Sequence, residues 1–163
     1  MKKVVFIFTF PLFLLASCQS RDIQKLNDSI AHANIELSEG TNKFIQKLDS
    51  VKEYNFSPLE ADRLAMVALI DKNLKMVEGI DAGMPGGQDF KNAFLDYYKL
   101  EKDVYESEYG KICQIRGGDS AYQKLQETRA SMKDKMNKEN QLEKNIHLEQ
   151  ESFARKNNLK LQQ

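Results

Sequence analysis

A seven-residue apolar repeat is the feature that most constrains the fold of this chain. Between residues 21 and 52, a large apolar side chain recurs at every seventh position, and further apolar residues occupy the intermediate turns. The repeat consists of Ile23, Ile30, Leu37, Phe44 and Val51, with Leu26, Ala33 and Leu48 between them. This spacing is typical of an amphipathic helix with a coiled-coil-like seam. The repeat therefore predicts one long first helix.

Clear signals mark the next two helices. In "EYNFSPLE", Ser57 is expected to cap a second helix, Pro58 suits the first helical position, and Glu60 occupies the acidic position of a capping box. This helix is expected over about 58–80 and ends at "DAGMPGG". Its predicted apolar face consists of Leu59, Leu64, Val67, Ile70, Leu74 and Val77. A third helix is expected over about 88–115, and its face is the most aromatic in the chain.

The last helix is expected to begin near Ser120, after "RGGDS", and to extend for about 40 residues. Its apolar positions follow a three-four spacing and comprise Tyr122, Leu125, Met132, Met136, Ile146 and Phe153. Arg129, Glu139 and Glu143 interrupt this seam. The second half of the helix is therefore expected to be half-buried or frayed.

These four segments predict an all-α fold, namely an elongated up-down four-helix bundle with coiled-coil-like packing and long first and last helices. Residues 22–163 are expected to form this single domain. In an up-down bundle the "EYNFSP" and "IRGGDS" turns lie together at one end. The "DAGMPGG" turn and the C-terminus then lie at the other.

The N-terminal segment "MKKVVFIFTFPLFLLASC" has the layout of a secretory signal peptide, with two lysines, an apolar run and small residues before a cysteine. The apolar run of about 13 residues is shorter than the roughly 20 that a transmembrane helix needs. Leu15-Ala16-Ser17-Cys18 resembles the bacterial lipobox, which implies cleavage between Ser17 and Cys18 and lipid attachment to Cys18. Residues 1–17 are then a cleaved signal peptide and residues 18–21 a lipidated tether. The alternative is an ordinary signal peptide with a chance cysteine.

Charge and cysteine content exclude two classes of protein. The chain has 24 basic and 24 acidic residues, and removal of Lys2 and Lys3 with the signal peptide leaves 22 basic residues against the 24 acidic ones. No basic face or tail indicates nucleic-acid binding. Because Cys18 is expected to be acylated, Cys113 has no disulfide partner, and we interpret it as a small buried apolar residue.

The sequence indicates neither a catalytic nor a metal site. His32 has Asp28 and Glu36 four residues to either side, but this pattern is typical of a solvated ladder of charged residues. His147 follows Glu143 by four residues, whereas di-iron bundles use a spacing of three. The chain is therefore predicted not to be an enzyme, and to contain no cofactor other than the covalent lipid.

Two further sets of residues are candidates for binding or modification. Aromatic side chains of the third helix could face a small apolar ligand inside the bundle, although such a stripe is more often core. These candidates are Phe90, Phe94, Tyr97, Tyr98 and Tyr105. Ser29, Ser50 and Ser120 each follow an aspartate and precede an apolar residue, which resembles the acceptor pattern of a periplasmic O-glycosylation system.

Two stretches, "FKNAFLDYYKLEKDVYESEY" (residues 90–109) and "FARKNNLKL" (residues 153–161), resemble the leptospiral-type surface lipoproteins, a family of small helical proteins of unknown function. The resemblance implies a lipid-anchored all-helical protein of the bacterial outer membrane. The predicted function is that of a non-enzymatic interaction or structural module with a protein partner in the envelope. A carrier or sensor of a small apolar ligand is the alternative. "QSRD" after Cys18 lacks an acidic run, so display on the surface and orientation toward the periplasm both stay open.

Overall fold

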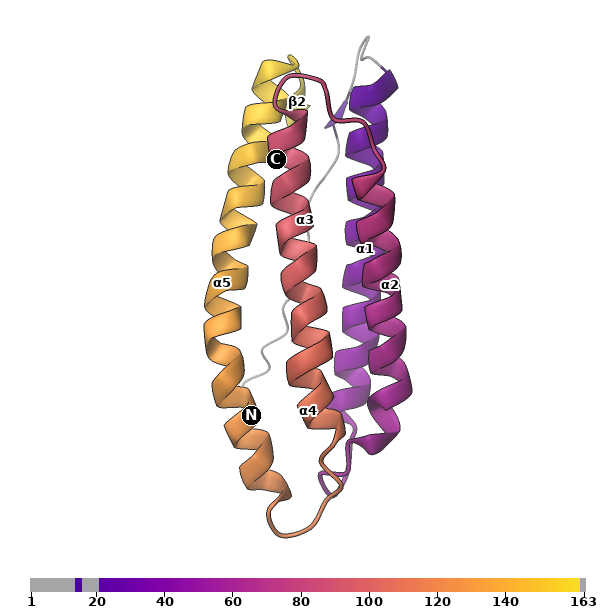
Figure 1. Ribbon diagram of the computed structural model, residues 1–163, viewed down its shortest axis with the longest axis vertical. Coiled ribbons are helices and arrows are strands. Elements are labelled where there is room, and N and C mark those ends of the chain that lie inside the picture. Colours follow the sequence, from indigo (N-terminus) through magenta and orange to yellow (C-terminus); the bar gives the residue numbers. More distant parts are fainter. Residues whose placement is uncertain (1–13, 16–20, 162–163) are drawn as a thin grey trace.

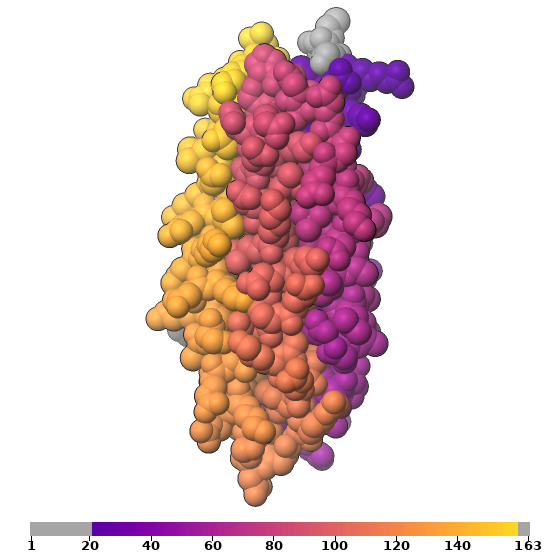
Figure 2. All heavy atoms as spheres, in the orientation of Figure 1, coloured from indigo at the N-terminus to yellow at the C-terminus, as the bar shows by residue number. Residues whose placement is uncertain are grey.

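The computed structural model describes residues 14–15 and 21–161, and Cys18 and Ser17 lie outside them. Helices make up 82% of the structure, so the fold is all-α, as predicted. Four helical rods lie side by side and form an elongated bundle (Figure 1). The space-filling view shows them as long columns, with the third rod between the second and the fourth on the face in view (Figure 2).

Helix α1, Arg21–Asp49, buries the predicted apolar seam. Ile23, Leu26, Ile30, Ala33, Leu37 and Phe44 are all buried. The helix ends before the last heptad, so Val51 lies in the following turn and is half-buried. Gly40 lies where α1 approaches the second rod, and a β-carbon there would be 2.7 Å from Met66 Sδ.

The second rod consists of a short 3₁₀ turn, η1 (Ser57–Leu59), and helix α2 (Glu60–Glu78). The predicted capping box does not form: neither η1 nor α2 has a side-chain cap hydrogen bond. Ser57 Oγ donates to Asn55 Oδ1 at 2.8 Å, and Glu60 accepts hydrogen bonds from the Arg63 guanidinium. Leu64 was expected on the apolar face but is exposed. At the other end of α2, Lys91 donates hydrogen bonds to the carbonyl groups of Glu78 and Ile80, which satisfies acceptors that the helix leaves free.

The third rod is helix α3 (Gly87–Asp103), a π-helical turn η2 (Val104–Glu108) and helix α4 (Tyr109–Cys113), one after another without a break. The periodicity predicted one uniform helix here, so the π-helical turn is a departure from it. Such a turn accommodates one extra residue and frees a carbonyl group. Arg63 Nη1 donates to the carbonyl of Tyr105 within this turn at 3.2 Å.

The fourth rod, α5 (Ala121–Lys156), is one continuous helix of 36 residues. We expected its second half to be either half-buried or frayed. It is half-buried, and the helix is continuous. The helix ends at Lys156, short of the C-terminus. Tyr122 was expected in the seam and is exposed. Helix α5 packs chiefly on α3, and α1 packs chiefly on α2.

Contacts between segments that are distant in the sequence close both ends of the bundle. At the far end from the start of α1, Phe56 N–H donates to the Ile115 carbonyl at 2.9 Å, and Asn55 and Arg116 form an antiparallel bridge. At the near end, Asn157 Nδ2 donates to the Pro85 carbonyl at 2.8 Å. There too, the two-residue strands β1 (Leu14–Leu15) and β2 (Lys160–Leu161) pair antiparallel (Figure 1). The "EYNFSP" and "IRGGDS" turns therefore meet, as the sequence predicted.

Candidate functional sites

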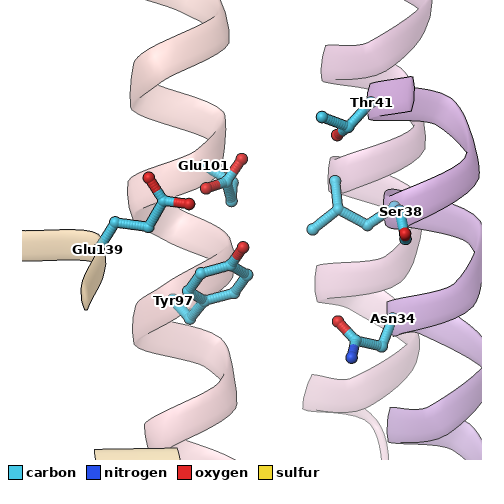
Figure 3. A pocket seen from close by; sticks show the side chains of 7 residues that line it. Asn34, Ser38, Thr41, Tyr97, Glu101 and Glu139 are labelled. Atoms are coloured by element: carbon cyan, nitrogen blue, oxygen red, sulfur yellow. The ribbon is translucent and has the colours of Figure 1, made fainter. Parts of the chain in front are cut away.

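A small hollow lies between α1, α3 and α5, where no helix fills the space completely. Its volume is about 40 Å³, which is room for about two or three water molecules. Both polar and apolar side chains line it, and they belong to all three helices (Figure 3). The lining residues are Asn34, Leu37, Ser38, Thr41, Tyr97, Glu101 and Glu139. A buried carboxylic acid is the least expected member of this set.

Glu101 lies on the inner face of α3, one turn after Tyr97, and only 8% of it is exposed. Burial raises the pKa of its carboxyl group to about 8, and the negative charge of Glu139 adds to the increase. A hydrogen bond with Tyr97 acts in the opposite direction. Glu101 is therefore expected to carry its proton at neutral pH.

Helix α5 presents the second carboxyl group of the hollow. The carboxyl groups of Glu139 and Glu101 point toward one another in Figure 3. Burial raises the pKa of Glu139 to about 7, and the charge of Glu143 one turn further along α5 contributes. Burial also raises the pKa of Glu143, against the opposing effect of His147. The negative charges of Glu139 and Glu143 therefore each favour the neutral form of a neighbouring carboxyl group.

Nearby lysines do not compensate the carboxyl pair because they bind other carboxylates. Lys102 Nζ lies 2.7 Å from Asp71, and Lys135 Nζ lies 2.6 Å from Asp103 and 3.3 Å from Glu108. Glu108 is also buried, but its pKa is lowered rather than raised. Burial alone would raise its pKa, but hydrogen bonds from Ser131, Lys111 and Lys135 lower it to about 2. The same residue type is thus charged in one turn and neutral two turns earlier.

The aromatic residues that we predicted as ligand-facing are core residues in this structure. Phe90 stacks on Phe153 with ring centroids 5.3 Å apart, and Phe94 packs on Tyr98 at 5.0 Å. Tyr105 donates a hydrogen bond to Thr41 Oγ1 at 3.2 Å. Of the five candidates, Tyr97 lines the hollow described above.

The serines of the Asp-Ser-apolar pattern lie in different environments. Ser29 is half-buried within α1, whereas Ser50 and Ser120 are exposed at helix ends. Ser50 Oγ donates to the carbonyl of Lys47 at 2.7 Å. Their glycosylation stays a prediction.

His32 and Cys113 lie in environments that do not indicate a catalytic or metal site. His32 is exposed and lies 3.6 Å from Glu36, which itself binds Lys72. Cys113 is buried, and burial raises the pKa of its thiol to about 11. Within residues 14–15 and 21–161, no group of three or more His, Cys, Asp or Glu side chains is arranged to hold a metal ion. None of the helices in these ranges is long and apolar enough to cross a membrane.

The far end of the bundle is the second candidate site. Tyr54 and Tyr122 are 43% and 55% exposed and pack edge to face, with centroids 5.7 Å apart. Glu53 and Tyr54 both have positive φ angles, 55° and 53°, a conformation that is unfavourable for residues other than glycine. The bridge between Asn55 and Arg116 fixes this turn. A strained backbone thus holds an aromatic pair at the surface.

The Glu101–Glu139 pair was not predicted from the sequence. The signal was present: Glu139 and Glu143 interrupt the seam of the last helix, and Glu101 lies on the aromatic face of the third. No family model, curated protein or solved structure matches this chain. The resemblance to leptospiral-type surface lipoproteins therefore stays a prediction.

Proposed function

We propose that this chain is an exported lipoprotein of the bacterial outer membrane that acts as a non-enzymatic interaction module of the envelope. The observation that carries this proposal is the lipobox-like Leu15-Ala16-Ser17-Cys18 and its place directly before the bundle. Helix α1 begins at Arg21, three residues after Cys18. A lipid on Cys18 would therefore hold the near end of the bundle close to the membrane.

The finer fold prediction belongs to this proposal. We expect the four rods to run alternately away from the membrane and back, with coiled-coil-like packing along the α1 seam. Helix α1 has 29 residues, or about 44 Å at 1.5 Å per residue. The Tyr54–Tyr122 pair would then face away from the membrane at about that height.

This aromatic pair is the surface that we assign to the protein partner. Tyrosine is enriched in contact surfaces because it gives a large, rigid, amphipathic area. Strained, well-held turns are also found at binding sites more often than elsewhere. The other exposed large apolar residues named for the described part of the chain, Ile35, Leu64 and Leu148, are aliphatic.

The anchor is tested first, by intact mass and detergent partitioning of the protein from its native envelope beside a Cys18→Ser variant. We expect a lipid-modified mass that begins at Cys18, and transfer of the variant to the aqueous phase. An unmodified mass would contradict the proposal. Protease treatment of whole cells decides orientation, because only a surface-displayed bundle is cleaved before the envelope is opened.

The contact surface is tested by photo-crosslinking in cells, with a photoreactive phenylalanine at Tyr122 and, as a matched control on the same helix, at Leu148. A protein adduct from position 122 that is lost with Tyr54→Ala, together with none from position 148, is the expected result. Equal adducts from both positions, or none from either, would contradict a far-end contact.

The alternative function, a carrier or sensor of a small apolar ligand, has one observation in its favour: the hollow reaches Tyr97 and Leu37. Its volume of about 40 Å³ is far below the roughly 300 Å³ of pockets for drug-sized ligands. A drug-sized ligand would therefore bind only if the helices moved apart. A carrier predicts a rise in melting temperature with a fatty acid or a small aromatic probe, because a ligand that binds only the folded state stabilises it.

A further inference from the structure

We propose that the Glu101–Glu139 hollow is a pH-dependent latch, which holds the middle of α5 against α3 in an acidic medium and releases it in a mildly alkaline one. The proposal does not depend on the lipid anchor or on the partner.

The latch stands first on geometry. Glu101 projects from α3 and Glu139 from α5 into one hollow, and their carboxyl groups point toward one another (Figure 3). When one or both carry a proton, the two carboxyl groups do not repel one another across the interface between the helices. When both are ionised, two negative charges face each other in a space that admits about two or three water molecules. The interface then becomes repulsive.

Among the residues that the structure describes, the charges that act on the pKa of Glu101 are those of Glu139 and Glu143, and both are negative. Helix α1 contributes uncharged polar groups, namely Asn34, Ser38 and Thr41. The third rod contributes tyrosines at positions 97, 98, 105 and 109, and α5 contributes Glu139 and Glu143. Lys102 of the third rod forms an ion pair with Asp71 on α2. His147 acts on Glu143 rather than on Glu101.

Strong contacts on both sides confine the release to the middle of α5. Toward the far end, Ser131 Oγ and Lys135 Nζ bind Glu108 at 2.7 Å and 3.3 Å. Toward the near end, Phe153 stacks on Phe90. We therefore expect the segment between about residues 136 and 149 to open while both flanks stay packed.

The direction of the pH effect follows from the two carboxyl groups. Burial raises the pKa of Glu101 to about 8 and that of Glu139 to about 7, from an ordinary value of 4.5. The folded chain then holds these protons more tightly than the unfolded chain does. Their stabilisation is complete below about pH 4.5 and is lost as the pH rises through about 7 to 8.

The test is amide hydrogen exchange of the full-length protein in mild detergent at about pH 5.5 and pH 8, after correction for the intrinsic exchange rate. We expect the protection of residues 136–149 to fall about tenfold or more at the higher pH, and that of residues 121–131 to stay unchanged. In a Glu101→Gln/Glu139→Gln variant, this segment should be protected equally at both pH values. Glu151→Gln, an exposed position on the same helix, is the matched control and should behave as the parent protein.

Three results would overturn the proposal. Protection that falls equally along all four rods would show a global rather than a local effect. A full pH response in the double variant would show that other groups are responsible. Unchanged protection of residues 136–149 between the two pH values in the parent protein would exclude a latch. This last result decides even if the double variant loses its helical circular dichroism.

Discussion

Replacement of Glu108 by glutamine should remove a buried charge that stabilises the junction of the third rod with α5. The Glu108 side chain is only 4% exposed, and it accepts hydrogen bonds from Lys111 at 3.0 Å and from Ser131 at 2.7 Å. Lys135 lies 3.3 Å away. Glutamine keeps the size of the side chain but removes the negative charge that Lys111 and Lys135 contact, although Lys135 still binds Asp103. The loss therefore reports on charge more than on packing.

The magnitude follows from the pKa. Hydrogen bonds and the two ammonium groups outweigh burial and lower the pKa of Glu108 from 4.5 to about 2. At about 1.4 kcal/mol per pKa unit, the folded state stabilises the charged carboxylate by about 3 kcal/mol. Since the folded-state pKa is the lower one, this stabilisation is complete above about pH 4.5 and is lost as the pH falls toward 2.

Urea unfolding followed by far-ultraviolet circular dichroism, at pH values between 2 and 7, measures this contribution. At pH 7, Glu108→Gln should lower the free energy of unfolding by about 3 kcal/mol, and the difference from the parent protein should disappear near pH 2. Glu106→Gln is the matched control, because Glu106 is 51% exposed and lies 3.7 Å from Lys102. Its loss should stay below about 1 kcal/mol.

A difference that is constant from pH 7 to pH 2 would refute this reasoning. The loss would then arise from altered packing or from the amide group itself, and the hydrogen-bonded charge would contribute nothing measurable. A loss as large for Glu106→Gln would equally refute it, since an exposed pair would then match a buried one.

Three further predictions concern the core. Phe153→Ala, which removes a fully buried ring that stacks on Phe90, should lower the free energy of unfolding by about 3–5 kcal/mol in urea titrations. Gly40→Ala should destabilise the parent protein, because the new β-carbon would lie 2.7 Å from Met66 Sδ, but it should be neutral or stabilising in a Met66→Ala background, where alanine's better helix propensity prevails. Cys113 should resist iodoacetamide at pH 8 until urea unfolds the chain, as measured by mass, since it is buried and its thiol pKa is raised to about 11.

Periodicity predicted the helices well because it depends on one chain segment at a time. The seam of α1 needs only a repeat of seven, and it was confirmed from Ile23 to Phe44. Turn signals were equally local, as at "DAGMPGG", where Gly86 adopts a positive φ of 75° before α3. The all-α class and the approximate bounds of the four rods follow from such signals.

Departures occurred where tertiary contacts decided between local options. Ser57 had the sequence context of a helix cap, but its hydroxyl group donates to Asn55 Oδ1 in the turn that pairs with Arg116, and it makes no cap hydrogen bond. Tyr122 fitted the spacing of the last helix, yet it packs on Tyr54 at the surface. The π-helical turn was not predicted, and within it the carbonyl of Tyr105 accepts a hydrogen bond from Arg63 of another helix, a contact that one segment alone does not reveal.

The two buried glutamates of the third rod show why the candidate site could not be predicted from one helix. Glu101 and Glu108 are seven residues apart and follow Phe94 by seven and fourteen, so a helical pattern treats them as equivalent. Their pKa values nevertheless move in opposite directions. Burial raises the pKa of Glu101, with a contribution from Glu139 on α5, whereas hydrogen bonds from Ser131, Lys111 and Lys135 outweigh burial and lower the pKa of Glu108. That difference depends in part on the register of α5 against α3, which helical periodicity does not specify. The chemistry of the hollow is therefore a property of the assembled bundle.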